Sequence, residues 1–184
     1  HRTHGGQRML QELSPLVAQE IRSWLEHAKT RPGRSHRAVA CAEVMDPRLM
    51  ASLTLKVLID SLAVSRPYTG TAMLLANLIQ DCWIANRFRD ECKYEYDQWR
   101  RRMKGKPYSI RKRAMKAFMR EYHDTTAKWD PADRCALGTV LIEVAIKATG
   151  ICEVNHRRKG KKIDLVLEPS LQALEWLEGQ NSLA

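Results

Sequence analysis

Residues 46–62 read DPRLMASLTLKVLIDSL and predict the main kind of element in this chain. Asp46 is a favoured N-cap residue, and Pro47 suits the first helical position because its missing N–H would have no partner there. Apolar side chains then recur at helical spacing, as expected of one buried helix face. They are Met50, Leu53, Val57, Leu58 and Leu62. The stretch therefore predicts an amphipathic helix.

The same start signal occurs twice more, at Ser14-Pro15 and at Asp130-Pro131. Each is followed by an apolar stripe at helical spacing, so each predicts another helix that begins at the proline. The stripes are Val17, Ile21, Trp24, Leu25 and Ala28, and Leu137, Val140, Leu141, Val144 and Ala148. Gly150 is placed to end the third helix as a C′ residue.

Two further helices are predicted between these signals. One covers residues 71–103 and ends at Lys104-Gly105-Lys106-Pro107, because glycine and proline both interrupt helices. The other covers residues 109–122, with four apolar side chains facing inward. The two inward-facing sets are Leu74, Leu75, Leu78, Cys82, Ala85 and Phe88, and Met115, Phe118, Met119 and Tyr122.

The pattern changes after Gly150. Two short β-prone runs flank Arg157-Arg158-Lys159-Gly160-Lys161-Lys162 and predict a β-hairpin over residues 151–168 with this basic stretch as its turn. A last helix follows Pro169, through Leu171, Leu174 and Leu177, and ends at Gly179. The predicted fold is mainly α, a single domain over residues 1–184 with a helical body at 13–150 and one hairpin near its C-terminal end.

Composition narrows the class of function. Of 184 residues, 31 are Lys or Arg and 21 are Asp or Glu, which gives a net charge of +10. This surplus favours a polyanionic partner, nucleic acid first and an anionic membrane face second. No apolar run is long enough to span a membrane, and no signal peptide is visible. Because the chain starts with His1-Arg2, we expect a fragment, a processed product or the ordered part of a larger protein.

The five cysteines favour neither a disulfide framework nor a zinc site. Their number is odd and no two form a CxxC pair, so free thiols in a reducing cytoplasm, mostly buried on helices, are expected. They are Cys41, Cys82, Cys92, Cys135 and Cys152.

The first concentration of positive charge is a loop at residues 29–37, KTRPGRSHR, within a segment free of acids from 27 to 42. A basic loop containing proline and glycine suits the narrow minor groove of A·T-rich DNA, where negative potential is strongest. A solvated connection between helices is the alternative. The candidate DNA-binding residues are Lys29, Thr30, Arg31, Arg34, Ser35, His36 and Arg37.

The second concentration runs from residue 100 to 120 without an acid. Such dense like charge is costly unless an anion lies nearby, and aromatic residues beside it can stack on unpaired bases. The alternative is a solvated helix pair with core aromatics, which here are Tyr94, Tyr96, Trp99 and Tyr108. The candidate contacts are Arg100, Arg101, Arg102, Lys104, Lys106, Arg111, Lys112, Arg113 and Lys116, with Arg120 beyond them.

The third concentration is the predicted hairpin turn. Its basic residues suit a DNA backbone or a junction between paired and unpaired strands, and the alternative is a soluble turn. The candidate residues are His156, Arg157, Arg158, Lys159, Lys161 and Lys162.

Catalytic and metal motifs are absent from the sequence. It contains no GxxxxGK[ST], GxGxxG, HExxH or GxSxG, and His123-Asp124 alone does not make a metal site. No catalytic residue and no metal ligand is therefore assigned, and no acid such as Asp60 or Asp81 is given a catalytic role.

Five stretches, in order, resemble the N-terminal domain of the single-subunit DNA-directed RNA polymerases of T-seven-like phages. They are residues 16–24 with the following basic loop, ASLTLK at 51–56, IANRFRD at 84–90, RAMKAFM at 113–119, and IEV at 142–144 through ATG at 148–150 with the hairpin and LEP at 167–169. They cover most of the chain, from about residue 13 to residue 176.

The resemblance implies roles for the basic segments. The loop would enter the minor groove of upstream A·T-rich promoter DNA, with Arg31 or Arg34 as the reader, since Pro32 precedes Gly33. The hairpin would hold the upstream edge of the melted bubble by charge, and residues 88–129 would refold and help line the path of the nascent RNA.

The resemblance also implies what lies elsewhere. Nucleotidyl transfer in this family uses two metal-binding aspartates, a lysine and a tyrosine in a C-terminal portion, so Mg²⁺ is expected there and no cofactor in this chain. The implied partners are promoter DNA, nascent RNA and the catalytic portion, with no membrane, in the cytoplasm of an infected bacterium. A stand-alone helical nucleic-acid-binding regulator is the alternative. An independent enzyme is a third class of function, and no motif in the sequence supports it.

Overall fold

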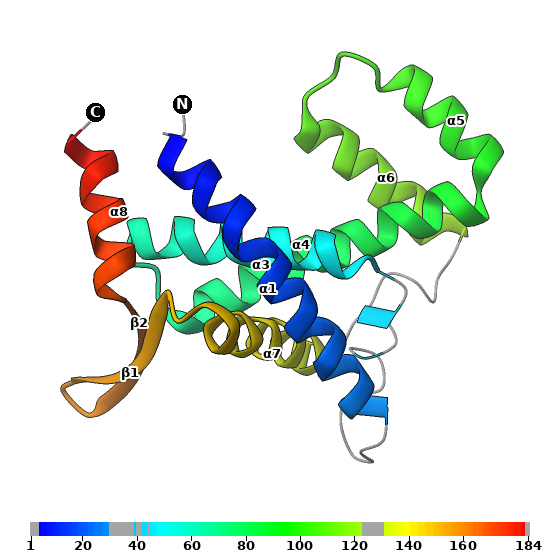
Figure 1. Ribbon diagram of the computed structural model, residues 1–184. Helices are drawn as coiled ribbons and strands as arrows, with labels where there is room; N and C mark the ends of the chain where they lie inside the picture. The colour runs from blue at the N-terminus through cyan, green and yellow to red at the C-terminus, as the bar shows by residue number, and fades with distance from the viewer. Residues whose placement is uncertain (1–3, 30–38, 40–41, 44, 123–130, 183–184) are drawn as a thin grey trace. The chain divides into compact units, whose positions relative to one another are not determined.

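The protein is described from a computed structural model, which covers residues 4–29, 39, 42–43, 45–122 and 131–182. Within these ranges the chain forms helices and one antiparallel hairpin near the C-terminal end, so the predicted fold class is confirmed (Figure 1). The elements are α1 His4–Lys29, α3 Pro47–Ala63, α4 Tyr68–Glu91, α5 Lys93–Arg102, α6 Tyr108–Tyr122, α7 Pro131–Thr149, β1 Cys152–Lys159, β2 Lys162–Pro169 and α8 Leu171–Ser182.

The chain contains two compact units. The first unit combines His1–Asn77 with Pro131–Ala184, and the second unit is Leu78–Asp130. Helix α4 begins in the first unit and ends in the second.

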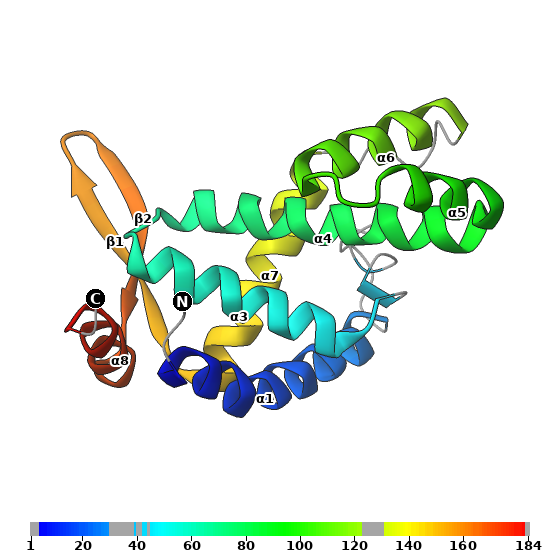
Figure 2. The ribbon, with the colours of Figure 1, turned by 90° about the horizontal axis from the view of Figure 1, so that it is seen from above.

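The core of the first unit lies between α1, α3 and α7, and Figure 2 shows α3 alongside α1 with α7 packed against both. The apolar stripes predicted for these helices face this core, since most of their members are buried. The largest fully buried side chains here include Ile21, Met50, Leu55, Leu58, Leu137, Leu141 and Ile142. Burying these apolar side chains is the main stabilising contribution to the unit.

Helix α7 approaches α4 so closely that only glycine fits at residue 138. A Cβ built on Gly138 would overlap the backbone carbonyl of Ala72. Any residue larger than glycine at position 138 would therefore clash with the backbone of Ala72. A backbone carbonyl cannot rotate out of the way as a flexible side chain could.

Three of the predicted helix boundaries are confirmed, and one of them is the start of α7 at Pro131. Asp46 caps α3, since its carboxylate Oδ1 accepts a hydrogen bond of 2.9 Å from the backbone N–H of Arg48. Gly150 ends α7 with a φ of 62°, and its N–H donates to the carbonyl of Ile146 at 2.8 Å. A positive φ of this kind favours glycine because other residues lose energy there through their Cβ.

The predicted start of the first helix at Pro15 is wrong. Helix α1 begins at His4 and continues through Pro15 to Lys29. Pro15 has no N–H to donate to the carbonyl of Gln11, but both residues are exposed, so water can satisfy that carbonyl. The local cap signal is overridden because apolar residues continue at helical spacing upstream.

The hairpin turn is shorter than predicted. Strands β1 and β2 pair in antiparallel register up to Lys159 and Lys162, which leaves Gly160 and Lys161 as a two-residue loop. Gly160 has a φ of 62° at the first loop position, where a tight hairpin turn requires glycine. Arg157, Arg158, Lys159 and Lys162 therefore lie on strands, and strand pairing fixes the face that each one occupies.

Helix α8 also differs from the prediction. The hydroxyl of Ser170 accepts a hydrogen bond of 3.3 Å from the N–H of Ala173, so this serine caps the helix. Ala173 is buried, whereas Leu171 is 81% exposed. The helix passes Gly179 and ends at Ser182.

In the second unit, the single helix predicted over residues 71–103 is two helices. The break occurs at Cys92, where neither glycine nor proline is present. It is explained by packing, because the ring of Phe88 on α4 makes edge-to-face contacts with Tyr96 and Trp99 on α5. These contacts require α5 to turn back onto α4, and no residue within the helix signals them locally.

Candidate nucleic-acid interface

The proposed minor-groove loop lies outside the described residues. Of its candidates only Lys29 belongs to a described element, at the end of α1, and its side chain is not described. Thr30, Arg31, Arg34, Ser35, His36 and Arg37 are outside the described ranges, as are His123-Asp124. The role of this loop therefore stays a prediction from sequence.

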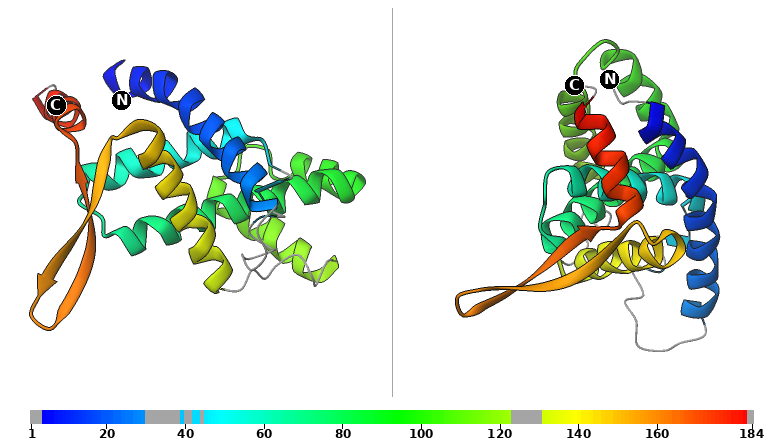
Figure 3. Two further views of the ribbon diagram at one scale, coloured as in Figure 1. Left: turned by 60° about the horizontal axis from the view of Figure 1, so that its bottom comes forward. Right: turned by 60° about the vertical axis from the view of Figure 1, so that its left-hand side comes forward.

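The hairpin presents its basic half to solvent. All residues from 156 to 164 are exposed, and both views of Figure 3 show this end of the hairpin extending away from α1, α3 and α7 of the first unit. Near the helices the strands are partly buried instead, as at Val154 and Leu167. The buried end anchors the hairpin, and the exposed end carries the charge.

Register divides the hairpin charges between two faces. His156 and Arg158 lie on the same face as Leu165 and Ile163, and Arg157, Lys159 and Lys162 lie on the opposite face. Arg157 has an acidic neighbour, since its Nη2 lies 3.6 Å from Oε1 of Glu168. This exposed pair contributes little to stability.

Two of the candidate cations on α6 are held by a buried acid. Asp81 on α4 is 4% exposed, and its carboxylate forms ion pairs with Nζ of Lys112 and Lys116, the latter at 2.9 Å. The hydrogen bond from Lys112 to Asp81 raises the pKa of that lysine. These two lysines serve the fold of the second unit, whereas the other candidates on α5 and α6 have no such partner among the described acids.

Sequence reasoning missed the structural role of Asp81. The signal was available, since Asp81 is a single acid among apolar residues of α4, and α6 has no acid in its first turn. A buried carboxylate requires cationic or hydrogen-bonding partners, and the acid-free stretch at residues 100–120, which includes most of α6, is an obvious source of them.

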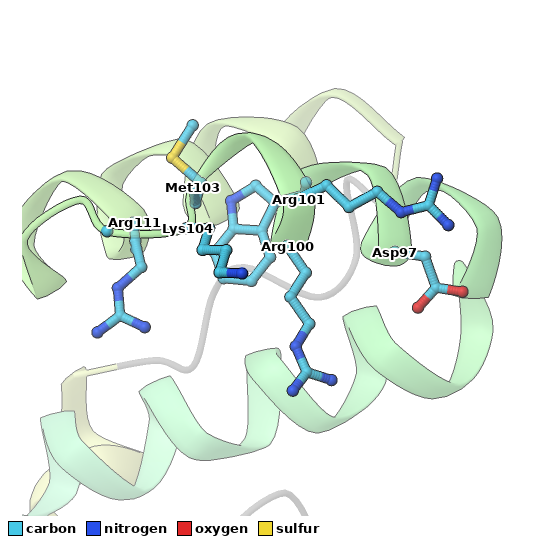
Figure 4. A pocket seen from close by; sticks show the side chains of 8 residues that line it. Asp97, Arg100, Arg101, Met103, Lys104 and Arg111 are labelled. Carbon is cyan, nitrogen blue, oxygen red and sulfur yellow. The ribbon is translucent and has the colours of Figure 1, made fainter.

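Four of the remaining candidate cations border a cavity of about 660 Å³ between α5 and α6. Four basic side chains, Arg100, Arg101, Lys104 and Arg111, line it together with one acid, Asp97, and the indole of Trp99. In Figure 4 the side chains of Arg100, Lys104 and Arg111 extend in the same direction, and that of Arg101 extends to the side on which Asp97 lies. We call this cavity the basic pocket.

The aromatic residues divide into two kinds. Tyr96 and Trp99 pack on Phe88, with their rings stacked 5.7 Å apart, so the core interpretation holds for these two. Tyr94 and Tyr108 are 71% and 60% exposed, and the guanidinium of Arg111 lies 5.8 Å from the ring centre of Tyr108. Only the exposed pair is accessible for stacking on a base.

Three of the cysteines are poor nucleophiles. Burial raises the pKa of Cys82, of Cys92 and, to about 12, that of Cys152. Among the described residues, no group of three or more His, Cys, Asp or Glu side chains could hold a metal ion. No helix in the same ranges is long and apolar enough to cross a membrane.

The chain has a distant relative among phage polymerases. It is 27% identical over 166 residues to the DNA-directed RNA polymerase of Enterobacteria phage T3. The match covers 83% of this chain and 18% of the phage protein. No family model matches the chain.

The match to the phage polymerase is longer than either unit of this chain. It spans the hairpin-bearing first unit as well as the second unit, since a match of this length cannot be confined to either.

Proposed function

We propose that this chain is the promoter-handling N-terminal region of a phage-type single-subunit DNA-directed RNA polymerase. The observation that carries the proposal is the similarity over 83% of the chain to a phage polymerase. The exposed, basic half of the hairpin adds support, since cations on a projecting turn suit DNA phosphates. Nucleotidyl transfer, and the Mg²⁺ that it requires, then belong to the rest of the polymerase.

Each basic segment has one role in this proposal. The loop at residues 29–37 reads the minor groove of upstream A·T-rich promoter DNA. The exposed half of the hairpin holds the upstream edge of the melted bubble, and the second unit contacts the nascent RNA and refolds as initiation gives way to elongation. The protein acts in the cytoplasm of an infected bacterium.

The loop is tested by binding of the chain to A·T-rich and G·C-rich duplexes across a salt series. Tighter A·T binding with steep salt dependence supports minor-groove reading. Arg31→Ala with Arg34→Ala removes the preference and leaves non-specific binding. Unchanged discrimination in this double variant contradicts the role of the loop.

The hairpin is tested by comparing a forked duplex with a closed one. Arg158→Gln with Lys159→Gln weakens binding to the fork more than binding to the closed duplex, because these side chains lie at the exposed end. Arg22→Gln with Lys56→Gln is the matched control, since both residues are exposed in the first unit and the charge change is the same. Equal losses on both duplexes contradict a position at the bubble edge.

A further inference from the structure

The basic pocket carries more positive charge than the fold explains. The last turn of α5 contains Arg100, Arg101 and Arg102, and cations at a helix C-terminus are favoured by about 0.3–1 kcal/mol each. Arg111 has the opposite position, in the first turn of α6, where the helix dipole disfavours a cation. Bringing Arg111 to the same cavity as two arginines of α5 is therefore locally unfavourable.

The contrast with the neighbouring lysines is informative. Lys112 and Lys116 have Asp81 as a common acidic partner, so their charge is neutralised within the unit. Among the described residues no acid forms an ion pair with Arg100, Lys104 or Arg111, and all three are exposed. Asp97 is the one acid that lines the pocket, against four cations. An anion from outside would relieve this imbalance.

The surroundings of the pocket indicate what kind of anion would fit. Tyr108 is 60% exposed, and Arg111 connects its ring to the pocket. Cations that track phosphates beside an accessible aromatic ring are typical of surfaces that bind unpaired nucleic-acid strands, whose bases are free to stack. In a closed duplex the base faces are covered by neighbouring pairs, so such a ring has no base to contact.

We propose that the basic pocket binds the phosphate backbone of an unpaired nucleic-acid strand, with Tyr108 stacking on one of its bases. Arg100, Lys104 and Arg111 contact adjacent phosphates, and the packing of Trp99 on Phe88 and Tyr96 fixes α5 so that its arginines are already in place. This proposal rests on the nucleic-acid role given above to the second unit and assigns it a site.

The test is binding of the full 184-residue chain to a labelled oligo(dT) or oligo(U) of about a dozen nucleotides, followed by fluorescence anisotropy. The pocket variant is Arg100→Gln, Lys104→Gln, Arg111→Gln. The control is Arg102→Gln, Lys106→Gln, Arg113→Gln, which removes the same charges from exposed positions of the same unit that do not line the pocket. Both sets are at the surface, so both variants keep their helical circular dichroism.

We expect the pocket variant to lose about tenfold or more in affinity and the control about threefold or less, because only the first removes organised phosphate contacts. Tyr108→Leu weakens oligonucleotide binding and leaves competition by tripolyphosphate unchanged. Equal losses in the two triple variants overturn the proposal. It is also overturned if ATP or tripolyphosphate binds in the pocket while the oligonucleotide does not.

This experiment separates the pocket from the proposed polymerase function. If the chain prefers A·T-rich duplex but both triple variants bind the oligonucleotide equally, the pocket is wrong and the promoter role stands. If the chain shows no duplex preference but the pocket variant alone loses the oligonucleotide, the promoter role is wrong and the pocket stands.

Discussion

Asp81 connects two helices of the second unit through charge. It is on α4, and its two lysine partners are four residues apart on α6, so they lie on one helix face. Burial of a carboxylate is costly unless cationic partners are present. Removal of the acid leaves the two lysine charges side by side without a counter-charge.

Asp81→Asn is therefore expected to destabilise the second unit by about 2–3 kcal/mol. The loss is smaller than for a fully buried pair because both lysines are partly exposed and can turn to water. Denaturant unfolding measures the change. Asp90→Asn is the control, since Asp90 forms only an exposed pair with Arg89 and its loss costs about 1 kcal/mol or less. Equal effects of the two substitutions would contradict the structural role of Asp81.

Gly138 is constrained by backbone rather than by side chains. Gly138→Ala forces the carbonyl of Ala72 to move, so we expect a loss of at least about 1–3 kcal/mol in the free energy of unfolding. Gly70→Ala is the matched control, because Gly70 is exposed on α4 and the nearest atom to an added Cβ is the side-chain Cγ of Arg66 at 3.6 Å. That substitution is expected to stabilise by about 0.4–1 kcal/mol. A neutral Gly138→Ala would show that the helices are not in such close contact.

At this scale the sequence predicts some roles and not others. The cap at Asp46 and the C′ position of Gly150 follow from local chemistry, so they could be read directly. Asp81 and Gly138 depend on residues far along the chain, and no local rule identifies which lysine or carbonyl they will meet. Sorting Tyr94 and Tyr108 from Tyr96 and Trp99 likewise required the packing around Phe88.

At the scale of elements, α1 is the clearest departure from the sequence prediction. Asp46-Pro47 and Ser14-Pro15 carry the same local signal, yet only the first begins a helix. Met9, Leu10 and Leu13 continue the apolar spacing before Ser14 and are half-buried. A start signal is therefore decisive only where the residues before it cannot join the same face.

Pro15→Ala discriminates between the two interpretations of this helix. Inside α1, alanine restores the hydrogen bond to the carbonyl of residue 11 and removes the ring, so stability rises by about 1–3 kcal/mol. At a helix start, the same substitution would be neutral or slightly destabilising. Thermal unfolding of the two chains measures the difference, and an unchanged or lower Tm would contradict a helix that begins at His4.

The break between α4 and α5 is the reverse case, because a helix ends there without a local signal in the sequence. The apolar stripe predicted for residues 71–103 ends at Phe88, and Phe88 is fully buried. The direction of the chain after Cys92 is decided by three aromatic rings that meet only once α5 has folded back. Periodicity reports which face is buried, but it does not report where a helix stops when no glycine or proline marks the end.

At the scale of the whole molecule, the single domain expected from sequence contains two units with separate cores. The core of the second unit is formed by Ile84, Phe88, Cys92 and Met115, and that of the first unit lies between α1, α3 and α7. Each core can therefore be weakened without a direct change in the other.

Phe88→Ala and Met50→Ala are expected to give reciprocal patterns of hydrogen exchange. The first costs about 3–5 kcal/mol and should lower amide protection in α5 and α6, while α1 and α3 keep theirs. Met50, which is fully buried on α3, should give the reverse. Loss of protection in all helices with both variants would show that the two units unfold as one.

The contact between Gly138 and Ala72 has a consequence for how the chain tolerates insertions. The chain leaves the first unit after Asn77 and rejoins it at Pro131, so the helices on either side of this excursion already meet backbone to backbone. In topological terms the second unit is an insertion. A change in the length of that insertion would leave the contact between Gly138 and Ala72 in place, because both residues lie outside it.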